Sequence, residues 1–491
     1  MGRAADECRE RKVWRPQQTF KIVNMTRLLR RIFWQVILFF LLLLTIGCRQ
    51  AGEPGEAGIG DDLFPNLGNG GYDVQHYDLA LTWDDETGEI EGTATLTAVA
   101  TQDLSGFNLD LHALTVDGIT VNGQEVTHSR EDDELVITLP EGIMLEEGDT
   151  FETAVIYHGI PEPNDDEFFT IGWVPYNSGV YVISEPNGAH SWYPANDHPA
   201  DKATYAMHIT VPKPYVVAAS GAASERVDNG DTATYTFIED DLMASYLATV
   251  NIAPYIVHTE TGAKSGIPIS NYIEESISSD LFDAFNNQDE ILAMLIDRFG
   301  PYPYDEAGGI VPDARFGVAF EAQTRPIYDK NMLDNNGDLV IVHELAHQWF
   351  GNSLSPQTWD QIWLNEGFAT YAEVLWLEHT DGEPYAAGYI QSLYEEEERD
   401  TTPPAVINSG SADTLFSKSV YLRGGLTLHA LRRTVGDELF FEILQTYAAR
   451  HAHSNVTTDD FITIAEDISG QSLDKFFDEW LFESSLPELP Q

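Results

Sequence analysis

Cysteine is almost absent from this sequence. Its 491 residues include two cysteines, Cys8 and Cys48, and both lie near the N-terminus. The rest of the chain therefore has no disulfide bond, no thiolate metal ligand and no cysteine nucleophile. Such a fold has to rest on its apolar core, and the 43% hydrophobic and 11% aromatic content is that of a folded protein.

Positive charge is also scarce. The chain has 26 lysines and arginines against 80 aspartates and glutamates, a net charge of −54. Residues 1–47 hold nine of the basic and three of the acidic residues, so the remainder is still more acidic. A surface of this charge should repel nucleic acid and anionic lipid headgroups, so we expect no nucleic-acid partner. We expect a solvated acidic surface, and an attraction for cationic peptides is the alternative.

The N-terminus carries a targeting pattern. Arg27, Arg30 and Arg31 precede an uncharged apolar run over 33–46. A basic segment followed by a short apolar segment is typical of a secretory signal. The run closes on a glycine and Cys48, which resembles the bacterial lipoprotein signal, in which the cysteine carries the lipid. We therefore predict a targeting segment over 1–48 and a protein outside the cytoplasm, tethered as a lipoprotein or secreted.

Two alternatives remain open for this segment. One is that the segment is an uncleaved signal anchor, although the run is short for a bilayer span of about 20 residues. The other is that translation begins at Met25 and not at Met1, which gives a signal of more ordinary length. After it, residues 49–66 are rich in Gly, Glu and Ala without apolar periodicity, so we predict a flexible linker.

The remaining chain divides into two regions of different periodicity. Residues 67–258 alternate apolar and polar side chains in segments such as TATYTFIE, separated by turn residues, which predicts an antiparallel β domain shaped as a saddle or sandwich. Residues 259–491 show helical spacing in segments such as ELFFEILQTYAARH, with some strand at the start. The fold class predicted is α+β, with a β domain followed by a mainly helical domain. No internal repeat of fixed period is present.

A metal-binding pattern lies in the second region. HELAH places His343 and His347 four residues apart, which puts both imidazoles on one face of a helix. Catalytic zinc takes three protein ligands and keeps one open position. Glu366, after eighteen intervening residues, is the predicted third ligand. Glu344 lies beside the histidines and is the predicted base, so we expect one zinc ion per chain.

One further carboxylate points to the same site. Glu373 follows Glu366 by seven residues, two helical turns, and so lies on the same face. We expect it to accept the free N–H of His343 and orient that ligand. A solvated surface glutamate is the alternative.

At these motifs the chain resembles the aminopeptidase N family of gluzincin zinc metallopeptidases. The resemblance rests on HELAHQWFGN, WLNEGFATY, YDVQHYDLALTW and the segment TTDDFITIAEDISGQSLDKFFDEWLF, and covers roughly 67–486. It implies a saddle-shaped β domain followed by a thermolysin-like catalytic domain. The large helical C-terminal domain of many relatives is not expected here, so the cleft is expected to be more open.

The resemblance also implies substrate-binding residues. The family's GxMEN loop, whose glutamate binds the substrate α-amine, is matched by the stretch containing Gly317, Ala319 and Glu321. Phe320 and Ala322 depart from Met and Asn of that loop, which bears on the preference for the N-terminal side chain.

Two other residues are carried over in the same way. The family has a second acidic or amide residue before a Pro–x–x–Asp–x–Pro turn, here 194–199, and Glu185 is its match. The family's Tyr-x-Lys-Gly stretch holds the tyrosine that stabilises the oxyanion. Here it begins at Tyr421 and has Arg423 in place of lysine. A phenol is a good donor to a developing negative oxygen.

The predicted function is a zinc-dependent aminopeptidase that acts on peptides with a free N-terminus. Two carboxylates at the closed end of the cleft favour a substrate ammonium, which sets the first peptide bond at the metal. Another zinc hydrolase on the same site, either an endopeptidase or an epoxide hydrolase, is one alternative. A non-catalytic peptide-binding module is the other. The sequence predicts neither an oligomeric state nor a preferred N-terminal residue.

Overall fold

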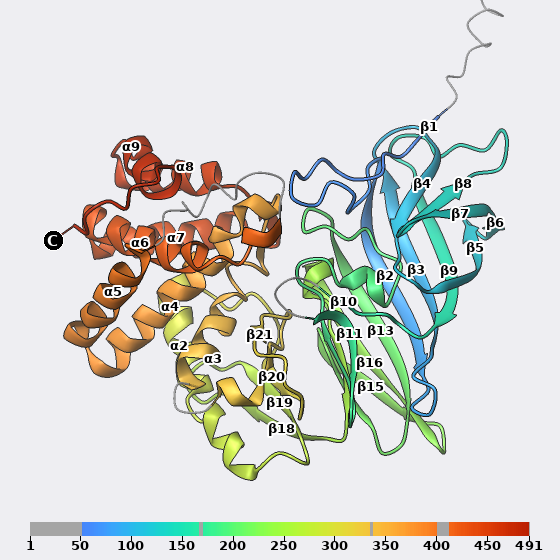
Figure 1. Ribbon diagram of the computed structural model, residues 1–491, viewed down its shortest axis with the longest axis horizontal. Coiled ribbons are helices and arrows are strands. Elements are labelled where there is room, and N and C mark those ends of the chain that lie inside the picture. Colours follow the sequence, from blue (N-terminus) through green and yellow to red (C-terminus); the bar gives the residue numbers. More distant parts are fainter. Residues whose placement is uncertain (1–51, 166–169, 334–336, 400–411, 491) are drawn as a thin grey trace, which may run out of the picture. The chain divides into compact units, whose positions relative to one another are not determined.

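The protein is described here from a computed structural model, which defines residues 52–165, 170–333, 337–399 and 412–490. The predicted targeting segment 1–48 lies outside these residues, so its lipid-signal and anchor interpretations stay predictions. Among the described residues, no helix is both long and apolar enough to cross a membrane. Figure 1 shows the described strands and helices in the colours of the sequence.

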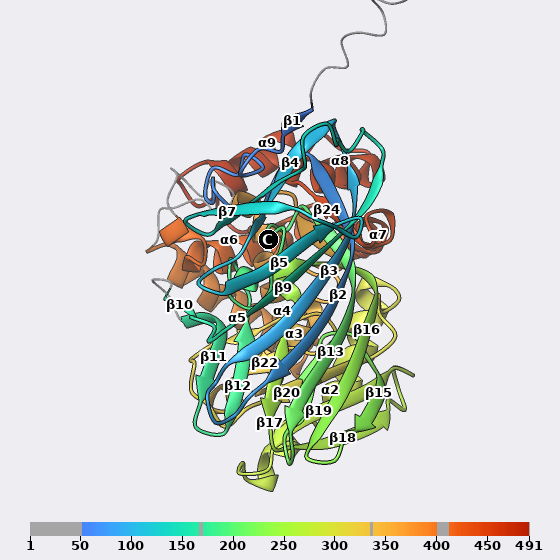
Figure 2. The same cartoon turned by 90° about the vertical axis from the view of Figure 1, so that its right-hand side faces the viewer.

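The first region folds around a large twisted sheet. Its described strands lie in the order β15-β16-β13-β2-β3-β9-β5-β6, all antiparallel except the parallel pair β13–β2. Buried and exposed residues alternate along β2 and β3, as the period of two predicts, so one face packs on the core. Figure 2 shows the long strands β16, β13, β2 and β3 side by side. The strands are β2 (Tyr72–Trp83), β3 (Ile90–Ala100), β5 (Thr115–Val121), β6 (Gln124–Glu125), β9 (Thr150–Gly159), β13 (Lys202–Pro212), β15 (Ala222–Asp228) and β16 (Thr232–Ala244).

Two smaller sheets complete the β domain. One has the order β1-β4-β8-β7 and the other β10-β11-β12-β17-β14. Strands β12 and β17 are buried along their whole length, as expected for strands covered on both faces. Their bounds are β1 (Glu53–Pro54), β4 (Leu104–Asp110), β7 (Thr127–Glu131), β8 (Glu134–Thr138), β10 (Asn164–Asp165), β11 (Thr170–Tyr176), β12 (Gly179–Ile183), β14 (Val216–Ala219) and β17 (Val250–Ala253).

The second region begins with a mixed sheet and continues as helices. The sheet has the order β18-β19-β20-β22-β21 and consists of β18 (Tyr255–Thr261), β19 (Pro268–Glu274), β20 (Ala307–Val311), β21 (Ala319–Phe320) and β22 (Ile327–Tyr328). The helices are α2 (Gln288–Phe299), α3 (Gly337–Ala346), α4 (Trp363–Asp381), α5 (Glu383–Glu397), α6 (Lys418–Val435), α7 (Asp437–Arg450), α8 (Thr458–Ser469) and α9 (Asp474–Phe477). A two-stranded ladder joins β23 (Leu354–Pro356) to β24 (Ser454–Val456). A β domain followed by a mainly helical domain confirms the α+β prediction.

Helices α4 and α6 approach unusually closely. A Cβ added to Gly367 on α4 would lie 2.8 Å from the backbone of Gly424 on α6, and one added to Gly424 would lie 2.7 Å from Gly367. Real Cβ atoms do not tolerate such contacts, so both positions require glycine. This contact fixes α6 against the helix that carries Glu366.

The structure differs from the predicted linker over 49–66. From residue 52 this segment packs on the body: β1 pairs with β4, and Leu63 is buried. The buried Asp61 accepts a 2.8 Å hydrogen bond from the backbone N–H of Trp359 and lies 3.1 Å from His198 Nε2. The buried side chains of Asp61 and Leu63 thus anchor a segment whose sequence has no apolar periodicity.

The domain boundary also differs from the prediction. Residue 258 lies inside β18, which pairs along its length with β19 of the second region. The change of sheet falls between β17 and β18, just before Tyr255. A boundary based on periodicity cannot separate two consecutive strands that belong to different sheets, because both have the same period.

Candidate active site

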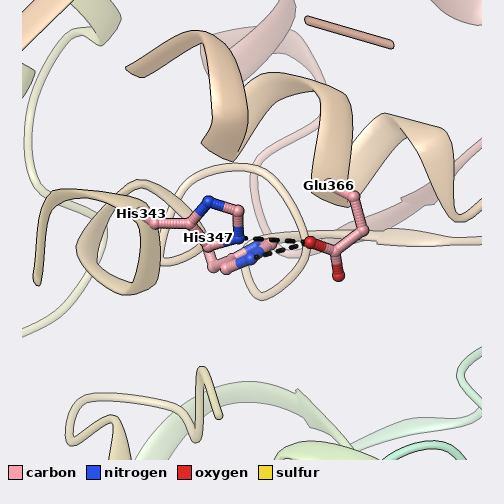
Figure 3. A group of neighbouring side chains, drawn as sticks. All are labelled: His343, His347 and Glu366. Atoms are coloured by element: carbon pink, nitrogen blue, oxygen red, sulfur yellow. Dashed lines mark hydrogen bonds and ion pairs between the residues drawn. The ribbon is translucent and has the colours of Figure 1, made fainter. Parts of the chain in front are cut away.

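The predicted metal ligands converge from two helices. His343 lies in the last turn of α3, His347 directly follows that helix, and Glu366 lies in the first turn of α4. Packing of Phe350 against Phe368, with ring centroids 4.5 Å apart, holds the end of the first helix against the second. Figure 3 shows the Glu366 carboxylate directed at both imidazoles.

The distances between these donor atoms fit zinc. Glu366 Oε2 lies 3.2 Å from His343 Nε2 and 3.5 Å from His347 Nε2. Two donors about 2.1 Å from one tetrahedral zinc ion lie about 3.4 Å apart. The two imidazole nitrogens and the carboxylate are also the ligand types of catalytic zinc sites. The residues present therefore fit the ion.

The electrostatics of the three side chains also favour a cation. Burial works against a charged imidazole, yet hydrogen bonds with Glu366 and Glu373 raise the pKa of His343 well above its usual range. Burial likewise opposes ionisation of Glu366, but attraction by His347 and hydrogen bonds with both histidines lower its pKa to about 2. The surrounding carboxylates thus favour positive charge at the two histidines.

Glu373 occupies its predicted position. It lies 2.8 Å from His343 Nδ1, which leaves Nε2 free for the metal. Tyr389 on α5 donates a 2.6 Å hydrogen bond to the other oxygen of Glu373. A carboxylate held at both oxygens fixes the orientation of the histidine ring.

Glu344 lies next to the donor set without belonging to it. One oxygen of Glu344 lies within 4.8 Å of donor atoms of His347 and Glu321. Burial raises the pKa of Glu344 to about 8, and the neighbouring carboxylates add to this while both histidines oppose it. A carboxyl group that titrates near neutral pH is suited to accept a proton and return it.

Glu185 and Glu321 meet at one end of the site. Their carboxylates and that of Glu366 each have an oxygen within 4.8 Å of the other two. In both residues Oε1 is buried and has no hydrogen-bond partner among the described residues. Burial, followed by the charge of Glu321, raises the pKa of Glu185 well above its usual range. Two buried carboxylates so placed call for a positively charged partner.

Tyr421 on α6 lies beside His343. Its ring is nearly parallel to that of His343, with centroids 6.0 Å apart and planes 20° apart. The close contact of Gly367 with Gly424 places this turn of α6 beside the donor set. Arg423 is buried and donates hydrogen bonds to the backbone carbonyls of Trp480, Glu479, Glu483 and Ser485. The arginine that replaces lysine here therefore ties α6 to the C-terminal segment.

The predicted site residues face one cavity of about 670 Å³. Gly317 and Ala319 line it, as predicted, and so do the apolar residues Val318, Val340 and Phe416. This volume is in the range of pockets that enclose one small ligand. The cavity brings all ten predicted site residues together.

Sequence reasoning missed several residues that support the site. Gln348 and Asn352 donate hydrogen bonds of 3.1 and 2.7 Å to the backbone carbonyl of Glu321. Gln348 lies inside the HELAHQWFGN motif, and this position next to the metal donors could have identified it as a residue that supports the site. Tyr389 had none, because nothing in its local sequence indicates that it meets Glu373.

Comparison with known proteins agrees with this architecture. Residues 73–247 match the Peptidase M1 N-terminal domain, and residues 310–480 match the Peptidase family M1 domain. The crystal structure of an M1 zinc metallopeptidase from Deinococcus radiodurans aligns with a TM-score of 0.81 at 31% identity, covering 88% of this chain and 99% of that one. A mutant of that enzyme bound to a Tyr-Ser-Ala substrate aligns with a TM-score of 0.82 over the same shares.

The fold and the donor set are those of a two-domain zinc metallopeptidase. The chain belongs to peptidase family M1. Curated relatives include aminopeptidase N of Streptomyces lividans, 24% identical over 442 residues, which are 83% of this chain and 50% of that protein. Aminopeptidase M1 of Arabidopsis thaliana is 27% identical over 326 residues, 62% of this chain and 36% of the plant protein. The chain thus spans half or less of the length of these two curated relatives.

Proposed function

We propose that this protein is a zinc aminopeptidase that removes the N-terminal residue of peptides. The carboxylates of Glu185 and Glu321 carry this proposal, because each has a buried oxygen beside the metal donors that finds no hydrogen-bond partner in the described part of the chain. A substrate ammonium supplies the missing charge and hydrogen-bond donors together. Aminopeptidase relatives and the tripeptide-bound neighbour support the same activity.

His343, His347 and Glu366 would hold one zinc ion per chain. When bound, the ion would supply Lewis-acid chemistry for the scissile carbonyl and the attacking water. The ammonium held by Glu185 and Glu321 fixes the first peptide bond next to the donor set, which is the positional advantage of an exopeptidase.

The other side chains move protons and stabilise charge. Glu344 accepts the proton of the attacking water and passes it to the leaving amine. The Tyr421 hydroxyl donates a hydrogen bond to the carbonyl oxygen as that oxygen gains negative charge. Glu373 and Tyr389 keep the His343 ring in its working orientation.

The test is a set of aminoacyl fluorogenic amides, assayed before and after chelation and after zinc is restored. Activity should vanish with the chelator and return with about one zinc per chain. Glu344→Gln should retain zinc while losing about 100-fold or more in turnover. Faster cleavage of N-blocked peptides than of free ones would favour an endopeptidase. Turnover of an epoxide alone would favour an epoxide hydrolase. Zinc-loaded protein without any turnover would favour a peptide-binding module.

We also propose that the protein is extracytoplasmic and held at a membrane through lipid on Cys48. The support is the basic and apolar pattern of residues 27–47 before this cysteine. Mass spectrometry of the native N-terminus checks the proposal. A start at Cys48 with added lipid mass is expected, whereas an unprocessed N-terminus on a cytoplasmic protein contradicts it.

A further inference from the structure

The active-site cavity contains one cationic side chain among its described lining residues. Glutamates 185, 321, 344, 366, 373 and 396 line it, and Lys418 is the single lysine or arginine. Five of these glutamates have places in the site described above. Glu396 and Lys418 have none.

Glu396 and Lys418 form an ion pair at an exposed part of the cavity wall. Lys418 Nζ lies 2.5 Å from Glu396 Oε1, and the two side chains are 74% and 45% exposed. Ion pairs this exposed contribute little to stability. Lys418 can therefore exchange Glu396 for another carboxylate at small cost.

Lys418 lines the same cavity as the ammonium site but comes from a different part of the fold. It is the first residue of α6, one helical turn before Tyr421, which stacks on His343. Glu185 and Glu321 belong instead to the segments after β12 and β21, and their carboxylates cluster with Glu366. The cavity thus has two carboxylates at one end and an exchangeable ammonium along the wall formed by α5 and α6.

Short peptides have the matching distribution of charge. A free tripeptide carries an ammonium and a carboxylate, separated by about 10 Å when extended. With the ammonium at Glu321, the carboxylate lies beyond the metal donors, within a cavity otherwise lined by negative charge. A cation there reduces the repulsion between this carboxylate and the glutamates.

We propose that Lys418 binds the terminal carboxylate of di- and tripeptides, and that Glu396 competes with the substrate for this lysine. The inference rests on the proposed aminopeptidase function and extends it to a substrate class, short peptides with both termini free. Longer peptides and carboxylate-free amides use the ammonium site alone.

The experiment compares Ala-Ala-Ala with its C-terminal amide on the zinc-loaded protein, using mass spectrometry to follow release of the first alanine. The readout is the acid-over-amide ratio of kcat/KM. Lys418→Gln should lower this ratio about three- to tenfold, mainly through KM, and Lys418→Arg should preserve it. Glu396→Gln should raise the ratio, because the lysine loses its competitor. The unmodified protein's ratio should also fall with added salt.

Lys475→Gln is the matched control. Lys475 lies on the short helix α9 and does not line the cavity. Its side chain is 86% exposed and pairs with Glu479 at 2.9 Å. Its variant should leave the ratio unchanged. A Lys418→Gln ratio equal to that of the unmodified protein, or a lower ratio in Glu396→Gln, overturns the proposal. If neither peptide is cleaved by any zinc-loaded variant or by the unmodified protein, the aminopeptidase function itself fails.

Discussion

Lys202 of the β domain donates hydrogen bonds to the backbone carbonyls of Asn352, at 2.8 Å, and of Ser353, at 2.9 Å. The lysine is buried, and burial lowers its pKa to about 7. The Asn352 side chain in turn donates a 2.7 Å hydrogen bond to the carbonyl of Glu321. A residue in β13 is thus linked through one asparagine to the backbone of Glu321, whose carboxylate is proposed to bind the substrate ammonium.

Lys202→Met is expected to disturb that carboxylate. The substitution removes the lysine donor from both buried carbonyls, although that of Asn352 keeps a 3.1 Å hydrogen bond from the Ser355 hydroxyl. A shift of about 1 Å at a reacting group costs roughly 100-fold in rate. We expect kcat/KM on aminoacyl amides to fall by about 10-fold or more with zinc content retained. Lys213→Met, a lysine of the same domain paired with Asp228 at 2.5 Å, is the control and should change little.

A double-mutant cycle separates this linkage from general damage. Asn352→Ala breaks the bond to Glu321, so adding Lys202→Met should cost less than it does alone. Fully additive losses in kcat/KM would mean that the two residues act independently.

Glu321→Ala should discriminate between free and blocked substrates. A hydrogen bond between charged groups contributes about 1.5–3 kcal/mol, and the positional effect adds to this. We expect unchanged zinc content and a loss of at least about 100-fold in kcat/KM on a free-amine substrate. The N-acetylated form should be a poor substrate of the unmodified protein and respond little to the mutation. Equal slowing of both substrates would assign Glu321 to structure or to the metal.

The residues that orient His343 should control zinc affinity. Glu373→Gln keeps an acceptor oxygen but loses the charge, and changes of this kind typically weaken metal binding about 10- to 100-fold. Tyr389→Phe should act in the same direction but less strongly, since it removes only the 2.6 Å hydrogen bond to Glu373. Tyr385→Phe changes an exposed tyrosine of the same helix and serves as the control. Competition with a fluorescent chelator measures each dissociation constant, and three equal values would contradict the role.

Local sequence was enough to identify the three side chains whose donor atoms converge in the candidate metal site. His343 and His347 are one helical turn apart, and the segment that carries Glu366 returns after a short connection. Glu185 and Tyr421 have no such local signal, and only the family resemblance identified them. Tyr421 shows why. Its turn of α6 is positioned by the contact between Gly424 and Gly367, which are 57 residues apart in the sequence.

Contacts between distant segments could not be predicted. The bond from Lys202 to Asn352 joins residues 150 apart, and the pair of Lys418 with Glu396 joins two helices. The packing of Asp61 and Leu63 likewise depends on a surface formed by other parts of the chain. Composition and periodicity report on local structure and carry no information about these partners.

Stability should depend on pH through a carboxyl group remote from the active site. Glu239 of β16 is 4% exposed, and its Oε2 is buried without a partner among the described residues. Burial raises the pKa of Glu239 to about 8, while the hydrogen bond from the Asp241 backbone N–H and the positive charge of Arg325 oppose the shift. The usual pKa of a glutamate in an unfolded chain is about 4.3.

The direction of this pH dependence follows from the raised pKa. The folded state binds the proton more tightly, so the stabilisation is fully present below about pH 4.3 and is lost as the pH rises through about 8. Glu239→Gln cannot ionise and keeps its stability over this range. Its advantage in free energy of unfolding over the unmodified protein should therefore grow between pH 5 and pH 9 by at least about 1 kcal/mol. Urea unfolding at several pH values measures it, with Glu225→Gln, an exposed position on the neighbouring strand β15, as the control. An advantage for Glu239→Gln that stays constant or shrinks toward pH 9 would show that the buried carboxyl is not the group that titrates.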